Sequence, residues 1–93
     1  MKFAFLVMGN FSSQKDRATF PDGETSMIGV SSLEEAISVA KKLADEGVAC
    51  IELCGAFEET GARAIIEATG GKLPVGFVTH LPEQDSLFQA VFG

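Results

Sequence analysis

Four side chains in the sequence could do chemistry, and three of them fall within five residues. Cys50, Glu52 and Cys54 alternate with other residues in a segment typical of a β-strand, Val48–Cys54. Successive side chains of a strand point to opposite faces, so these three are expected on one face. The fourth is His80, the only histidine, at the end of a later apolar run. A thiol, a carboxylate and an imidazole together could support nucleophilic or acid–base chemistry.

Glu52 is the most informative of the four, because the strand around it is otherwise apolar. A carboxylate buried in such a strand costs several kcal/mol unless it is paired or protonated. Glu52 could therefore be a general base or a group that binds a ligand. It could equally be a structural carboxylate that is hydrogen-bonded to a hydroxyl, to a backbone group or to a neighbouring subunit.

Cys54 could act as a nucleophile if His80 lies close to it, since an imidazole can remove the thiol proton. The alternative is that Cys54 is a small buried hydrophobic residue, the commoner role of a free cysteine. A mixed metal site of Glu52, Cys54 and His80 has weak support, because the chain lacks paired Cys-x-x-Cys and His-x-x-x-His spacings. The expected catalytic residues are therefore Glu52, Cys54 and His80, and no metal site is predicted.

The elements that must position these residues alternate along the chain. A polar stretch, residues 10–26, follows the first apolar run, and its Pro-Asp-Gly turn would allow a hairpin of residues 17–20 with 24–28. The first run is continuously apolar, which is typical of a strand covered on both faces. The predicted strands are Phe3–Met8, Thr25–Val30, Val48–Cys54 and Val75–His80.

Three helices are predicted between and after the strands. Either Ser31 or Ser32, each with a glutamate three residues later, forms a capping box for a helix that ends at Gly47. A second helix spans about residues 58–69 and ends at two glycines, and Pro82 begins a third helix. The second helix is expected to bury Ala62, Ile65, Ile66 and Thr69, and the third has an apolar face of Leu87, Phe88, Val91 and Phe92.

This alternation predicts a single α/β domain over residues 1–93, with a mainly parallel sheet of about four strands and three helices packed on it. The hairpin would make the sheet mixed. Ligands bind open parallel sheets at the carboxyl ends of the strands. The site is expected at that edge, around the catalytic candidates Glu52, Cys54 and His80, with the ligand-binding candidates Asn10, Gly55 and Thr79.

Composition excludes several classes of partner. The formal net charge of −6 disfavours nucleic acids and anionic membranes, because both require clustered Lys and Arg. The two cysteines, four residues apart in one strand, would be ~13 Å apart, too far for a disulfide with each other. Free thiols fit a reducing compartment, and a cytoplasmic location is expected.

The small size of the chain points to assembly. A 93-residue chain has little room for a pocket of its own, so a homo-oligomer with the pocket at a subunit interface is expected. A small-molecule ligand is the other expected partner. Residues 55–61 lead from a strand into a helix, but they match neither the P-loop nor the dinucleotide fingerprint, so no cofactor is indicated.

Several segments together resemble a family of small uncharacterised prokaryotic proteins, a domain of unknown function. The resemblance covers the full length and implies no activity. The segments that carry the resemblance are residues 28–31, 35–47 and 74–79, together with Ile-Glu-Leu-Cys-Gly at 51–55, which is the most specific of them.

A weaker resemblance covers about a quarter of the chain. Ser-x-Glu-Glu-Ala at 32–36, followed by Glu-Gly-Val and Ile51-Glu52, is similar to the first βαβ unit of aldolases that cleave keto-deoxy sugar-acid phosphates. Those enzymes need a Schiff-base lysine on a later strand and a barrel of ~250 residues. The chain has neither, so no catalytic role is transferred from that family.

Two functions are therefore expected as alternatives. The first is a small-ligand-binding or enzymatic domain with its site at the carboxyl edge of the strands. The second is a non-catalytic homo-oligomeric interaction module. Its contacts would come from the phenylalanine-rich arm and the last helix, through Phe11, Phe20, Phe88 and Phe92.

Overall fold

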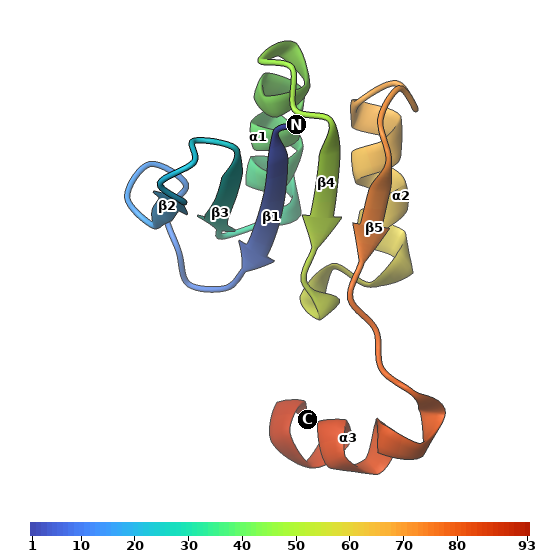
Figure 1. Ribbon diagram of the computed structural model, residues 1–93. Coiled ribbons are helices and arrows are strands. Elements are labelled where there is room, and N and C mark those ends of the chain that lie inside the picture. The colour runs from blue at the N-terminus through green and yellow to red at the C-terminus, as the bar shows by residue number, and fades with distance from the viewer.

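Strand β1 (Phe3–Met8) lies at the centre of a five-stranded sheet in the computed structural model, which describes residues 1–93 (Figure 1). The strand order is β2-β3-β1-β4-β5. Four strands run parallel, and only β2 is antiparallel to its neighbour β3. The predicted α/β fold with a mainly parallel sheet is confirmed, and the hairpin makes the sheet mixed. The other strands are β2 (Arg17–Thr19), β3 (Thr25–Val30), β4 (Cys50–Leu53) and β5 (Val75–Phe77).

Two helices, α1 (Leu33–Asp45) and α2 (Glu58–Ala68), cover one face of this sheet, the far face in Figure 1. The connections from β3 to β4 and from β4 to β5 both move across the sheet in the same direction. Because such crossovers are right-handed, both helices fall on the same face. The connection from β1 to β3 contains only the β2 arm and no helix. The second face therefore has no helical layer.

The prediction that β1 is covered on both faces is wrong. Ala4 and Leu6 are buried, whereas their neighbours in the strand, Phe3, Phe5 and Val7, keep part of their surface exposed. Their alternation follows the strand period of two, with one face towards the helices and the other towards solvent. The run is apolar on both faces, but only the face towards the helices is buried.

The core lies between the sheet and the two helices. Pairing places Leu6 opposite Ile28 on one side and Leu53 on the other, so these side chains form one row on the helical face. Thr69 is also buried, and its hydroxyl donates to the Ile65 carbonyl at 2.9 Å. Ile66, expected to face inward, is 41% exposed, because it points away from the sheet. The largest fully buried side chains are Leu6, Ile28, Ile51, Leu53, Ile65 and Val30.

The start of α1 shows which capping register the chain uses. Ser32 is the N-cap, and its hydroxyl accepts from the Glu35 N–H at 3.1 Å. The Glu35 carboxylate accepts from the Ser31 N–H at 2.6 Å and from the Ser13 hydroxyl at 3.0 Å. These bonds lower the pKa of Glu35, chiefly the one from the Ser31 backbone. One side chain thus joins the helix start to the arm between β1 and β2.

The same arm also packs over part of the uncovered face. The Phe11 ring lies against Gly9, and its Cβ would be 2.7 Å from a Cβ built at Gly29. Glycine at position 29 of β3 is therefore what lets the phenylalanine approach the strand. Phe20, at the tip of the β2–β3 turn, is 60% exposed.

The last helix is separate from the rest of the fold. After β5, residues 78–81 lead through the 3₁₀ turn η2 (Pro82–Gln84) into α3 (Asp85–Phe92), which lies beyond the carboxyl ends of the strands (Figure 1). No residue of α3 is buried. The expected packing of this helix on the sheet is not seen, because its connection carries it past the edge. No helix of the structure is long and apolar enough to cross a lipid bilayer.

Candidate functional site

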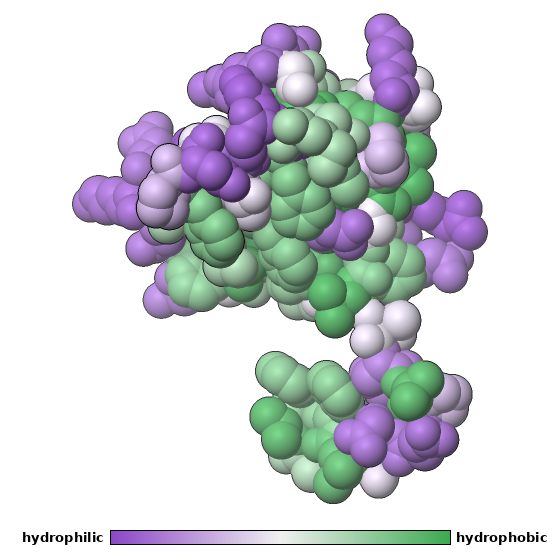
Figure 2. Space-filling view, in the orientation of Figure 1, coloured by the Kyte–Doolittle hydropathy of each residue, from purple (hydrophilic) through white to green (hydrophobic).

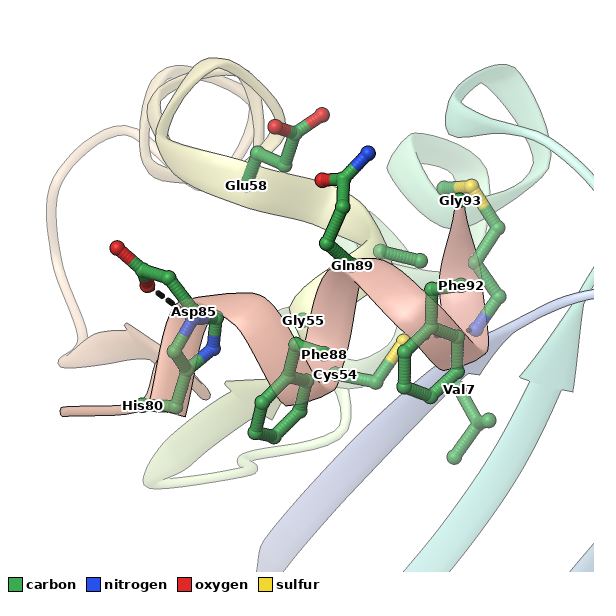
Figure 3. Close-up of a pocket in the computed structure, with 12 residues that line it drawn as sticks. Val7, Cys54, Gly55, Glu58, His80, Asp85, Phe88, Gln89, Phe92 and Gly93 are labelled. Carbon is green, nitrogen blue, oxygen red and sulfur yellow. Dashed lines mark hydrogen bonds and ion pairs between the residues drawn. The ribbon is translucent and has the colours of Figure 1, made fainter. Parts of the chain in front are cut away.

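A cleft of about 990 Å³ lies between the carboxyl ends of β1 and β4 and the separate helix α3 (Figure 3). Its position is the strand edge at which open parallel sheets bind ligands. Half of its lining residues are hydrophobic. The cleft is lined by Val7, Met8, Cys54, Gly55, Ala56, Glu58, His80, Asp85, Phe88, Gln89, Phe92 and Gly93.

Strand pairing positions Cys54 at this edge. Cys54 directly follows β4, and its N–H donates to the Leu6 carbonyl of β1 at 3.0 Å. Its Sγ accepts a hydrogen bond from the Met8 N–H at 3.3 Å. Gly55 then begins the 3₁₀ turn η1 (Gly55–Phe57), which turns the chain into α2. The sequence-predicted Cys54 and Gly55 thus lie in the cleft because β1 and β4 are adjacent.

His80 reaches the same cleft from the segment after β5. Its Nε2 lies 2.6 Å from Oδ1 of Asp85, in the first turn of α3. Its ring is stacked on Phe88, with centroids 3.9 Å apart and planes 8° from parallel. Phe88 is in turn stacked on Phe92 at 5.9 Å. The carboxylate and the aromatic ring together fix the imidazole, and Nδ1 is the nitrogen that Asp85 does not engage (Figure 3).

Cys54 and His80 line one cleft, but they are not hydrogen-bonded to each other. The cysteine sulfur is bonded to the Met8 backbone and the imidazole to Asp85. A nucleophile and its base need to be within hydrogen-bond reach, about 2.6–3.2 Å for most pairs. The structure therefore brings the two residues to one site without forming a nucleophile–base pair.

Glu52 lies outside this cleft, contrary to the expectation that it belongs to the same edge. It is in the middle of β4, opposite Phe5 and Gly76, on the face without helices. A Cβ built at Gly76 would be 2.8 Å from the Glu52 Oε2, so glycine leaves the room that the carboxylate occupies. Glu52 comes just before Leu53, the last residue of β4, and its side chain lies over the sheet beside Phe5 and Gly76 instead of extending past the strand end.

Cys50 shares that face with Glu52. Its Sγ is 3.9 Å from Oε1 of Glu52, to which the thiol donates. Burial raises the pKa of the Cys50 thiol, and the Glu52 carboxylate raises it further by repelling the thiolate and accepting the thiol proton. Cys50 is accordingly a protonated, weakly reactive thiol at neutral pH.

Two further sequence-predicted residues are not among those that line the cleft. Asn10 and Thr79 are both exposed, after β1 and in the segment after β5 respectively. Asn10 follows β1, as expected, whereas Thr79, expected within a strand Val75–His80, lies after β5, which ends at Phe77. Neither residue contributes to the lining. Glu52, Cys54 and His80 also form no metal-binding cluster, since no group of three or more His, Cys, Asp and Glu is arranged to hold a metal ion.

Sequence reasoning missed several residues that line the cleft. Asp85 and Glu58 fall at the expected helix starts, where an acidic residue needs no other explanation, and Phe88 and Phe92 were expected on an apolar helix face or in a subunit contact. The spacing of His80 and Asp85, with a proline between them, was the available signal for Asp85. Phe88 and Phe92 are one helical turn apart, but nothing in the sequence states that their helix lies beyond the sheet.

Glu58 has a backbone conformation unusual for its type. Its φ is 58° and its ψ is −176°, and it is the only residue other than glycine with positive φ. Such a conformation costs of order 1–3 kcal/mol in a residue with a side chain, and strained residues cluster at functional sites. The strained residue lies where η1 meets α2, and it is one of the residues that line the cleft.

Carboxylates outnumber basic groups in the cleft, whose one imidazole, His80, is paired with Asp85. Glu58 and Asp85 supply two carboxylates, and no Lys or Arg is among the lining residues. The aromatic rings Phe88 and Phe92 offer π faces, which attract cations. The cleft therefore suits a ligand with a positive charge and an apolar part, and it disfavours phosphates and carboxylates.

The chain belongs to the family of unknown function DUF6506, which it matches over residues 1–93. This finding confirms the resemblance to uncharacterised proteins that the Ile-Glu-Leu-Cys-Gly segment indicated. No curated protein and no solved structure matches the chain.

Proposed function

We propose that this protein binds a small cationic molecule with an apolar or aromatic part in the cleft between the strand ends and α3. The observation that carries the proposal is the cleft itself. It joins the carboxylates of Glu58 and Asp85 to the stacked rings of His80, Phe88 and Phe92. An ammonium group would be attracted by the carboxylates, and its apolar part would pack on the rings.

The size and location of the cleft support the same proposal. Small-molecule sites usually have volumes of about 300–1,000 Å³ and are largely apolar with a few placed polar groups. The cleft has about 990 Å³, with six hydrophobic residues among its twelve. The proposed role is binding rather than catalysis, because Cys54 is bonded to the Met8 backbone and not to His80. His80 Nδ1 supplies a hydrogen-bonding group for the ligand.

A reducing compartment is part of this proposal. Cys50 and Cys54 are both free thiols, and Cys54 lines the cleft, where oxidation would alter the site. We therefore propose a cytoplasmic location.

Isothermal titration calorimetry with benzylamine and with benzoate tests the proposal. The two probes share a ring and differ in the sign of their charge. Benzylamine is expected to bind with a Kd of about 1 mM, which is roughly −0.5 kcal/mol for each of its eight heavy atoms and well within the ceiling for small ligands, and benzoate should not bind measurably. Glu58→Gln should weaken benzylamine binding by roughly fivefold.

Glu59→Gln is the matched control. Glu59 is the next residue of the same helix, forms an exposed ion pair with Arg63 at 2.8 Å and does not line the cleft. Benzylamine affinity should be unchanged in this variant. Equal binding of the two probes, or equal loss of binding in the two variants, would overturn the proposal.

A further inference from the structure

Two apolar surfaces of the chain are largely uncovered, although Phe11 of the arm packs on Gly29 at one end of the first. The first, the open face, is the side of the sheet without helices, where Phe5 pairs with Met27, which is 51% exposed. Figure 2 shows this face as a continuous apolar area over the strands. The second, the outer stripe of α3, consists of Leu87 and Val91, which are 60% and 75% exposed. Parallel sheets almost always have both faces covered, so an open apolar face is unusual.

The two surfaces cannot cover each other within one chain. Helix α3 lies beyond the carboxyl ends of the strands, not over the open face (Figure 1). Only residues 78–81 separate β5 from η2. The cleft lies between α3 and the strand ends, and no residue of α3 is buried. The cover for both surfaces must therefore come from another molecule.

The accessible area indicates how large that contact is. The chain exposes 6156 Å². A compact monomer of 9.8 kDa would expose only about 5,200 Å². The excess is about 1,000 Å², and each partner in a standard stable interface buries about 800 Å². One contact of ordinary size would thus remove the excess.

We propose that this contact is a two-fold symmetric dimer, in which α3 of each copy packs its outer stripe on the open face of the other. A second copy supplies the missing cover for both surfaces at once, because a two-fold contact is reciprocal. An unrelated partner would have to match two separated surfaces. Glu52 pairs directly with Phe5, so α3 of the partner has to cross the open face on the β3 side of Phe5, over Met27, for this carboxylate to stay in water.

The dimer contact and the ligand cleft use different sides of α3. Phe88 and Phe92 line the cleft, whereas Leu87 and Val91 do not. The dimer therefore does not depend on the proposed ligand, and either proposal can fail without the other.

Light scattering during size-exclusion chromatography and native mass spectrometry test the dimer on the full chain. The protein is expected to be mainly dimeric at about 50 µM. Val91→Glu on α3 and Met27→Glu on the open face should each raise the dimer dissociation constant by about 100-fold, because each would bury a charge. Ile66→Glu is the matched control, because Ile66 lies on helix α2, away from both surfaces, and is 41% exposed. This variant should remain dimeric.

A monomer at this concentration would overturn the proposal, as would a dimer that survives either Val91→Glu or Met27→Glu. Circular dichroism melts show whether a variant is folded. If Met27→Glu does not melt cooperatively, the contact is tested in the native protein instead, in a sample prepared by mixing ¹³C-labelled with unlabelled chains. Intermolecular NOEs between the Met27 methyl group and the Val91 methyl groups are then expected, and their absence contradicts the exchange of α3. Benzylamine titration of the monomeric Val91→Glu protein, which keeps the cleft residues, separates the two proposals.

Discussion

The two faces of the sheet are built from the same strands, yet their surroundings are opposite. On the helical face Leu6 and Leu53 have no exposed surface, whereas Met27 on the open face is 51% exposed. Neighbours in sequence fall on different faces because side chains alternate along a strand. Apolar composition alone therefore does not say whether a residue holds the fold together or forms a surface for binding.

Truncating one side chain on each face should show the largest difference in the free energy of unfolding. Leu53→Ala removes a fully buried side chain between β4 and the helices and should lower the free energy of unfolding by about 3 kcal/mol. Met27→Ala should change it by less than about 0.5 kcal/mol in dilute monomeric protein. Urea denaturation at low chain concentration measures both. Equal losses would mean that the open face also contributes to the core.

Two glycines on the open face should respond differently to a methyl group. Gly29→Ala would place its Cβ 2.7 Å from the Phe11 Cβ, which is close to the backbone and cannot move away easily. We expect a loss of about 1–3 kcal/mol in the free energy of unfolding. At Gly76 the nearest atom is the Oε2 of Glu52 at 2.8 Å, the far end of a flexible side chain.

Gly76→Ala should therefore change the free energy of unfolding by less than about 0.5 kcal/mol, since only the carboxylate has to move. Thermal or urea unfolding of the two variants gives the comparison. A larger loss at position 76 than at position 29 would contradict the packing of Phe11 on β3.

The fold followed from sequence periodicity to a large extent. The continuous apolar run at Phe3–Met8 predicted β1, and the two possible capping boxes at Ser31 and Ser32 predicted the start of α1. The alternation of strands and helices predicted the parallel order, because right-handed crossovers leave few alternatives. The open face was not predicted. It depends on the direction in which successive strands are added, and local periodicity carries no information about that direction.

The candidate site was predicted only in part. Cys54 and His80 were placed at the strand edge because each ends a predicted strand, and Gly55 because it directly follows one. Glu52 was selected for its charge, although its position in mid-strand puts it on the open face. Glu58 could not be found from sequence, since its positive φ is a property of the turn between η1 and α2.

The arm and the helical layer are joined by Glu35, and this link should depend on pH. Its pKa is lowered from an ordinary value of 4.5, chiefly by the Ser31 backbone N–H. A lowered carboxyl pKa contributes stability above the unfolded value, and the contribution is lost as the pH falls through the folded value. The melting temperature of Glu35→Gln should be below that of the native protein at pH 7, and the gap should narrow between about pH 5 and pH 3.

Glu34→Gln is the control for this link, because Glu34 lies beside Glu35 in the first turn of α1. At pH 7 the melting temperature of Glu34→Gln should differ less from that of the native protein than the melting temperature of Glu35→Gln does. A gap for Glu35→Gln that stays constant down to pH 3 would contradict the role of the carboxylate.

The smallest expected effect is on thiol reactivity at the open face. Burial and the Glu52 carboxylate raise the Cys50 pKa, so its reaction with iodoacetamide at pH 8 should be slow. Glu52→Gln removes the charge that helps to raise the Cys50 pKa and should speed the alkylation of Cys50 roughly threefold, because more of the thiol is then ionised. Peptide mass spectrometry follows each thiol separately. Cys54, whose sulfur is bonded to Met8, should keep its rate, and an equal change at both thiols would contradict the assignment.

The central claim, that the cleft rather than the open face binds the ligand, is tested most directly by locating benzylamine in solution. Intermolecular NOEs from its ring protons are expected to the Met8 methyl group and the Phe88 ring, because both residues line the cleft. NOEs to the Met27 methyl group instead, with none to Phe88, would place the ligand on the open face and contradict the account.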